Sequence, residues 1–301
     1  MNARLLLMIV APLALLALSV FAFRARAAAR LDGPARNARR RAVLTSVLTA
    51  LAAAAFVVFS SWPEGGEIRL ATLPALAATV GIVLAVLAEL TWPRPHGERR
   101  EASIAVRRGT NVRWLGPLFL AGLGASALLL AIGVLTAGPT GRAVERAWST
   151  GAASAGPYPG VPYAVPMALA LAVLAVASWW ALRRVEARPA LGAGLEEVDR
   201  AIRVGARVRV FRLAAAGALL TAAGLSVTMG LSLIRVATVI QLNNGLEAPA
   251  PPWDWTQNAG FALMGLTIAC LVGTVWALLS PSPRVPEPVP GRDVVVAEAR
   301  R

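Results

Sequence analysis

Seven runs of about 20 apolar residues constrain this chain more than any other feature of its sequence. They cover residues 5–23, 42–62, 70–92, 114–136, 162–182, 213–234 and 261–279. A helix needs roughly 20 residues to cross a bilayer core that is about 30 Å thick. Each run is apolar on all sides, which is typical of a helix in lipid. The sequence therefore predicts an all-α bundle of seven transmembrane helices over residues 1–280.

The composition excludes the other broad classes of protein. The chain is 57% hydrophobic and 15% charged, whereas a soluble domain is about 45–50% apolar and about 25% charged. Disordered chains combine low hydrophobicity with high charge, so disorder is excluded as well. Of the classes considered, a multi-span membrane protein is the one that fits.

Arginine placement predicts the orientation of the spans. Segments 24–41, 93–113, 183–212 and 281–301 hold 25 of the 30 basic residues, all of which are arginine. The alternate segments hold five. Excess positive charge marks the cytoplasmic side, so we expect the N-terminus outside and the C-terminus inside. The net charge of +14 then lies on the inner face, where it attracts anionic lipid head groups, and it gives no reason to expect nucleic acid.

The first run has an alternative interpretation as a signal peptide, which would leave six spans instead of seven. Its length of 19 residues exceeds the roughly 7–15 of a signal h-region. The strongest cluster of arginines also follows the run rather than precedes it. We therefore expect the first span to be retained.

Two inner segments have recognisable patterns. Residues 195–212 predict a basic amphipathic helix at the inner interface or continuous with the sixth span, with Arg200, Arg203 and Arg207 beside its apolar stripe. These three arginines are candidate contacts for a partner or for lipid, and the alternative is a helical extension that only orients the span. The tail at 281–301 contains five prolines, which predicts a disordered cytoplasmic end.

Missing residue types exclude several chemistries. The chain has no lysine, so a standard P-loop ATPase and a lysine Schiff base are excluded. Its only histidine is His96 and its only cysteine is Cys270, which are too few for a His/Cys metal site or for an internal disulfide. We expect no cofactor and no metal.

Inside the spans, Glu89 is the one ionisable residue, close enough to the inner interface to pair with Arg94. Paired aspartates and an HExxH motif are absent, which excludes the intramembrane proteases that need them. The pairs Gly122–Ser126, Gly217–Thr221 and Gly224–Thr228 predict close helix packing, with the lining of a path as the alternative. Pro117 is a candidate kink in the fourth span, as Pro12 is in the first.

The outer loops supply the remaining candidate site residues. They carry Arg142, Glu145 and Arg146 in a Gly/Ser/Pro-rich loop, and Trp253, Asp254 and Trp255 before the last span. Asp254 between two tryptophans favours a helix cap with interfacial anchors. Recognition of a ligand is the alternative. These six are candidate ligand or interface residues, without the spacing of a catalytic constellation.

Two strings resemble a known group of proteins. ELTWPRP at 89–95 and SAGPYPGVPYAVP at 154–166 resemble an uncharacterised multi-span family of high-GC Gram-positive actinobacteria. The resemblance covers roughly residues 85–235. The family has no assigned activity, so the resemblance implies only a source and a plasma-membrane location and carries over no catalytic residue.

Three functions are compatible with the sequence. The first is a non-catalytic membrane subunit or accessory protein that docks a cytoplasmic protein through its arginine-rich face. The second is a transporter for a small or lipophilic solute, motivated by small-residue faces and prolines; no matching repeat of broken helices supports it. The third is a membrane enzyme acting on lipid through Arg142, Glu145, Arg146 and Asp254. The sequence favours the first, which is not an enzyme.

Overall fold

The computed structural model describes residues 67–90, 114–148, 151–187, 196–238, 240–243, 246–249 and 254–280. Within these ranges lie five helices: α3 (Glu67–Leu90), α4 (Leu115–Thr136), α5 (Val161–Glu186), α6 (Glu196–Ala237) and α7 (Asp254–Leu279). All five are long and apolar enough to cross a membrane, which confirms five of the predicted spans and a multi-span membrane protein. The predicted spans 5–23 and 42–62, His96 and the tail 281–301 lie outside the described residues.

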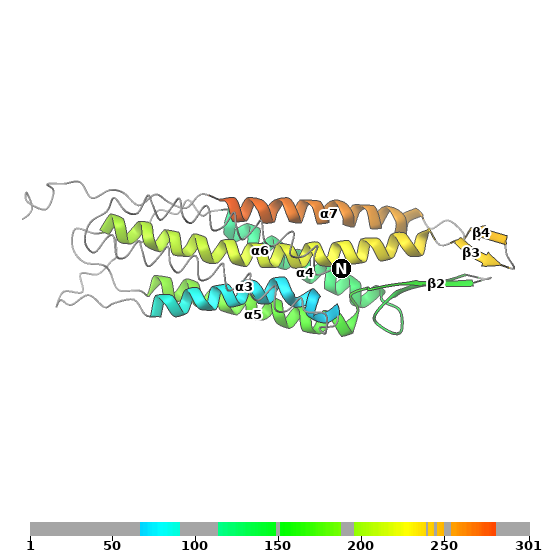
Figure 1. Ribbon diagram of the computed structural model, residues 1–301, viewed down its shortest axis with the longest axis horizontal. Helices are drawn as coiled ribbons and strands as arrows, with labels where there is room; N and C mark the ends of the chain where they lie inside the picture. Colours follow the sequence, from blue (N-terminus) through cyan, green and yellow to red (C-terminus); the bar gives the residue numbers. More distant parts are fainter. Residues whose placement is uncertain are drawn as a thin grey trace, which may run out of the picture.

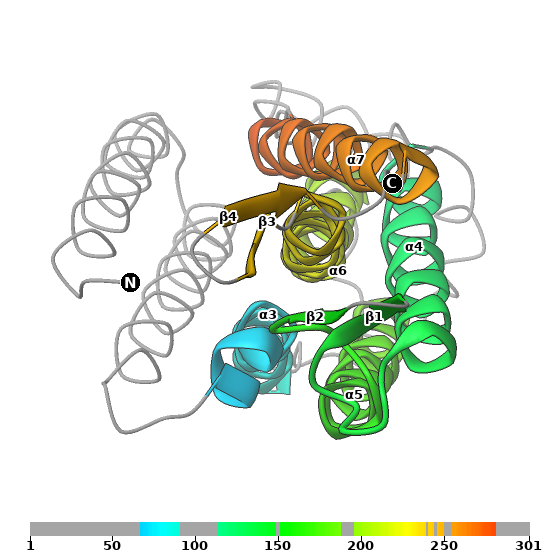
Figure 2. The same ribbon diagram turned by 90° about the vertical axis from the view of Figure 1, so that its right-hand side faces the viewer.

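Helix α6 lies at the centre of the described bundle. It contacts α3, α4, α5 and α7, and the view along the helices shows these four arranged around it (Figure 2). Alanines at 214, 215, 218 and 222 of α6 have no exposed surface. Small side chains let several neighbours approach the same helix, which is how a bundle packs when its surroundings are as apolar as its core.

Helix α6 is also much longer than a membrane requires. Its 42 residues span about 63 Å at 1.5 Å per residue, twice the hydrocarbon core. The predicted inner helix at 195–212 and the predicted sixth span are therefore one continuous helix. Figure 1 shows the start of α6 extending beyond the end of α5 and the end of α7.

Glycines mark the closest approaches between helices. A Cβ placed on Gly122 of α4 would lie 3.0 Å from the Cβ of Ala218 in α6, and the Ser126 hydroxyl donates to the Ala218 carbonyl at 3.3 Å. A Cβ on Gly217 of α6 would lie 2.5 Å from that of Ala78 in α3. The prediction that these residues serve packing is confirmed at Gly122, Ser126 and Gly217.

Two short hairpins were not predicted. Strands β1 (Val144–Trp148) and β2 (Gly151–Ala155) pair antiparallel, as do β3 (Ile240–Asn243) and β4 (Leu246–Pro249). Both hairpins lie at one end of the bundle (Figure 1). We call this the hairpin end, and the opposite end, where α5 ends and α6 begins, the arginine-rich end.

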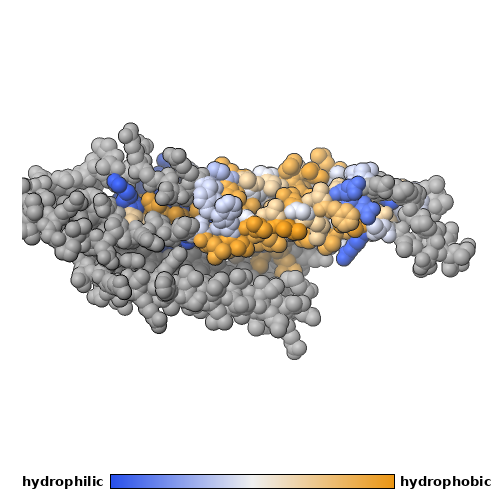
Figure 3. Space-filling view, turned by 90° about the horizontal axis from the view of Figure 1, so that it is seen from above, coloured by the Kyte–Doolittle hydropathy of each residue, from blue (hydrophilic) through white to orange (hydrophobic). Residues whose placement is uncertain are grey.

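The outside of the bundle suits a lipid environment. Figure 3 shows an apolar band across the middle of the coloured residues, with hydrophilic residues toward both ends. Large exposed apolar side chains on α4, α5 and α7, such as Leu135, Val176 and Leu279, contribute to the apolar surface of the bundle. Pro117 lies in the first turn of α4, where a missing N–H removes no helical hydrogen bond. Pro117 therefore removes no hydrogen bond from α4, and the physical cause of the predicted kink is absent at this position.

Candidate functional site

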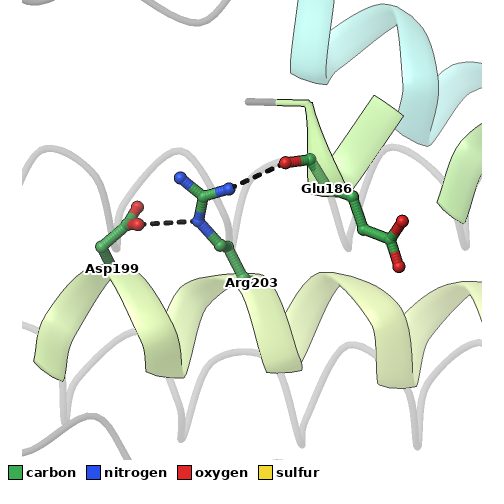
Figure 4. A network of polar contacts seen from close by, with 3 residues as sticks. All are labelled: Glu186, Asp199 and Arg203. Atoms are coloured by element: carbon green, nitrogen blue, oxygen red, sulfur yellow. Dashed lines mark hydrogen bonds and ion pairs between the residues drawn. The ribbon is translucent and has the colours of Figure 1, made fainter. Parts of the chain in front are cut away.

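A polar cluster joins α5 to α6 at the arginine-rich end. The Nε of Arg203 donates to Oδ2 of Asp199 at 2.7 Å, and its Nη1 donates to the backbone carbonyl of Glu186 at 3.2 Å (Figure 4). Asp199 and Arg203 are both buried. The Glu186 carboxylate lies 3.3 Å from Nη2 of Arg207 at the surface. A guanidinium at the end of α5 is favourable because carbonyls at a helix C-terminus carry partial negative charge.

The exposed side of the α6 extension differs from this buried side. Ile202, Ala206 and Val210 are buried, as the predicted apolar stripe requires, whereas Arg200 is exposed and Arg207 is half-buried. Arg200 and Arg207 are seven residues apart, so they lie on the same side of the helix. The three predicted contact arginines therefore differ in exposure. Arg203 is buried and forms hydrogen bonds within the bundle, while Arg200 and Arg207 remain accessible.

Arginines at the end of α5 lie over tryptophan rings. The guanidinium carbon of Arg183 is 5.5 Å from the ring centre of Trp179, and that of Arg184 is 5.7 Å from Trp180. Cations within about 6 Å of a ring face are attracted by its quadrupole. Tryptophan and arginine together are typical of a membrane interface, so these pairs mark the boundary of the apolar band at this end.

A further arginine fixes the end of α7. The side chain of Arg212 in α6 donates from Nε to the Ser280 hydroxyl at 2.8 Å and from Nη2 to the Ser280 carbonyl. The Ser280 hydroxyl in turn donates to the carbonyl of Ala277 at 2.8 Å. Arg212 therefore satisfies the Ser280 carbonyl directly after the end of α7, where backbone carbonyls have no partner within the helix.

At the hairpin end, two of the predicted outer residues, Glu145 and Arg146, lie on opposite faces of β1. Successive strand residues point to opposite faces, so Glu145 is exposed while Arg146 is buried. Arg146 lies over the ring of Trp148 at 5.4 Å. Glu145 lies against Gly138, where a Cβ would be 2.5 Å from its carboxyl carbon. Arg142 is exposed.

The second outer group is only partly described. Helix α7 begins at Asp254, and the side chain of this residue lies outside the described part of the structure. Trp255 is exposed, as an interfacial anchor would be. Trp253 lies outside the described residues, and so does Glu89's side chain.

Sequence reasoning did not single out the buried tyrosine of the α4–α5 connection. Tyr158 is buried, and its hydroxyl lies 2.7 Å from that of Thr136. Burial raises the pKa of Tyr158, and the hydrogen bond with Thr136 opposes that shift. Ser232 of α6 donates to the neighbouring Pro157 carbonyl at 3.1 Å, so this connection is fixed to the central helix. The Gly/Pro-rich sequence around Tyr158 gave no signal of its burial.

Metal ligands do not gather in the described part of the chain. No group of three or more His, Cys, Asp or Glu side chains within it is placed to hold a metal ion. In comparisons with protein-family models, with curated proteins and with solved structures, no match was found. The resemblance to actinobacterial multi-span proteins therefore stays a prediction, and any functional argument rests on the geometry above.

Proposed function

We propose that this protein is a non-catalytic membrane subunit or accessory protein of the plasma membrane. It docks a cytoplasmic protein at its arginine-rich end. It has seven spans in this proposal, with the N-terminus outside and the C-terminus inside. The observation that carries the proposal is α6, one continuous helix that extends beyond the ends of α5 and α7 (Figure 1). Its exposed Arg200 and half-exposed Arg207 suit an acidic surface on the partner.

The polar cluster supports this role by holding the extension in place. Arg203 and Arg207 join α6 to Glu186 at the end of α5, so the extension does not depend on its own helix propensity alone. A surface that is ordered before binding loses less entropy when a partner binds. Arg183 and Arg184, both exposed, are placed in this proposal against anionic lipid head groups.

The alternatives receive less support from the geometry. The small-residue faces at Gly122 and Gly217, which motivated a transporter, are filled by Ala218 and Ala78. Glu145 and Arg146, which motivated a lipid enzyme, lie on opposite faces of β1. Packing therefore explains the small-residue faces, and the two candidate residues on β1 do not face the same side.

The orientation is tested by labelling of single cysteines from outside the cell. In a Cys270→Ala background, Ser154→Cys places a thiol at the hairpin end and Ala187→Cys places one at the arginine-rich end; both positions are exposed. We expect an impermeant maleimide to label the first and spare the second. The reverse pattern would overturn the orientation and move the docking surface outside.

Docking is tested by charge reversal at Arg200, with Arg142→Glu as the matched control at the hairpin end, because both arginines are exposed. The tagged full-length protein is purified from its native membrane in mild detergent, and co-purifying proteins are measured by mass spectrometry. We expect one stoichiometric cytoplasmic protein that Arg200→Glu loses and Arg142→Glu retains. A single clean species, or equal recovery with both variants, would contradict the proposal.

A further inference from the structure

One strip of the central helix is left uncovered by the described helices. Leu220 and Leu231 of α6 are 36% and 40% exposed, and Gly224 between them is exposed as well. The other sides of α6 are occupied. Gly217 faces Ala78 of α3, and Ser226 shares a 2.8 Å hydrogen bond with Thr267 of α7. We call Leu220, Gly224 and Leu231 the open face of α6.

Helical spacing places the open face between α3 and α7. At 100° per residue, Leu220, Gly224 and Leu231 fall within about 40° of one another and about 20–60° from the direction of Gly217, while Ser226 points opposite to Gly217. Figure 2 agrees, because α3 and α7 lie on either side of α6 with no other labelled helix between them. A Cβ built on Gly224 has no atom within 4 Å. The open face therefore contains a notch with room for a close neighbour.

We infer that the segment 42–62 of this chain packs on the open face of α6. The first argument is the connection. Only residues 63–66 separate the segment from the start of α3 at Glu67, and five Cα steps reach at most about 18 Å. Neighbouring helices lie about 8–10 Å apart. The connection therefore limits the distance from the end of the segment to the start of α3 to about 18 Å, and the open face lies beside α3 within that reach.

The second argument is the match of small residues at the same depth. A segment that packs on the open face and leads into the start of α3 would run in the same direction as α6, and residues 42–62 contain four consecutive alanines at 52–55. Ala52 lies ten residues before Trp62, and Gly224 lies thirteen residues before the end of α6. Alanines facing a glycine let two helices approach closely in lipid, where packing rather than hydrophobicity drives association.

Disulfide trapping in the full-length Cys270→Ala protein tests this inference. Gly224→Cys is combined in turn with cysteine at Ala52, Ala53, Ala54 and Ala55, and the membranes are oxidised. Gly224 tolerates a side chain because the described structure around it is open. A disulfide needs Cα atoms about 4.4–6.8 Å apart, so we expect one or two of the four positions on a single helix face to cross-link and the others not to.

The control uses Gly124 of α4, which is also exposed and has no atom within 4 Å of a built Cβ. It lies twelve residues before the end of α4, at a depth like that of Gly224. Trypsin, which cuts after arginine, releases residues 42–69 and 213–235 as one disulfide-linked peptide if the inference holds. The intact protein must also run as a monomer on a non-reducing gel, because a disulfide between two copies of the chain would give the same linked peptide.

Three outcomes would overturn the inference. A disulfide-linked dimer would mean that a second copy of the chain covers the open face. If the cysteines at positions 52–55 cross-link to Gly124→Cys as strongly as to Gly224→Cys, the segment does not pack specifically on α6. No cross-link at any of the four alanine positions, with the variants folded and inserted, would mean that lipid covers the face.

Discussion

Helices α6 and α7 pack against each other but have different surroundings. About 61% of the candidate span of α6 is buried, against 22% of that of α7. Both are apolar enough to cross a membrane, so hydropathy does not explain the difference. The side chains do: α6 presents alanine and glycine to four neighbours, while α7 exposes large residues such as Ile268 and Trp276. In a bilayer, the position of a helix follows from the size of its side chains rather than from their polarity.

The largest effect that would sharpen this comparison is expected at Arg203 of α6. Arg203→Gln removes the ion-pair partner of the buried Asp199 carboxylate, and breaking a buried ion pair in this way costs roughly 3–5 kcal/mol. The free energy of unfolding, measured by SDS titration in mixed micelles, should fall by that amount. The double variant Asp199→Asn/Arg203→Gln should recover part of the loss, and no recovery would mean that the charge pair is not the cause.

Glycine substitutions compare the two helices directly. Gly217→Leu in α6 places a side chain where a Cβ already lies 2.5 Å from Ala78, and overpacking of this kind costs about 1–3 kcal/mol. Gly265→Leu in α7 enters space with no atom within 4 Å. The same titration should show a loss for the first and almost none for the second. Equal losses would break the proposed difference between the helices.

The buried tyrosine of the α4–α5 connection predicts a pH dependence of stability. Tyr158→Phe removes the hydrogen bond to Thr136, worth about 1 kcal/mol at neutral pH. Burial raises the pKa of Tyr158 in the folded state, so ionisation favours the unfolded chain. Wild-type stability should therefore be complete below pH 10 and fall as pH rises through the folded pKa.

The measurement is the difference in melting temperature between wild type and Tyr158→Phe from pH 7 to 11. The difference should shrink above about pH 10, where tyrosine ordinarily ionises. A difference that stays constant or grows would contradict the buried position of this hydroxyl.

The smallest effect concerns the hydroxyl pair shared by the two helices. Ser226 of α6 and Thr267 of α7 are hydrogen-bonded at 2.8 Å, and such pairs in membranes average about 0.6 kcal/mol. A double-mutant cycle of Ser226→Ala and Thr267→Val in SDS titrations should give a coupling near that size. A coupling indistinguishable from zero would mean that this hydroxyl pair contributes nothing to the packing of α6 against α7.

The helices were predicted and the hairpins were missed because only the helices have a clear pattern in the local sequence. Residues 114–136 differ from α4 by one residue because a 20-residue apolar run has few alternatives in a bilayer. The segment GAASA of β2 has none of the branched or aromatic residues that favour strands. The strand forms because its backbone hydrogen-bonds to β1, and the local sequence gives no sign of that pairing.

In the candidate site too, the sequence predicted some features and missed others, here at the level of single side chains. Sequence spacing placed Arg200, Arg203 and Arg207 together beside one stripe, and the α6 extension is helical as expected. Which arginine is buried depends on where α5 ends, because Arg203 donates to the carbonyl of Glu186. That carbonyl is a backbone group with no sequence signature, so the difference between Arg203 and Arg200 was not predictable.

The sequence by itself determined that this chain enters a membrane, where five of its spans lie and where its arginines gather. These follow from the cost of placing backbone and charge in hydrocarbon, which acts on each segment separately. Only the tertiary structure decided that α6 is central and that Gly217 meets Ala78. It also buried Arg203 while leaving Arg200 exposed. These depend on the mutual fit of distant side chains, because lipid and protein interior are equally apolar and hydrophobicity cannot tell them apart.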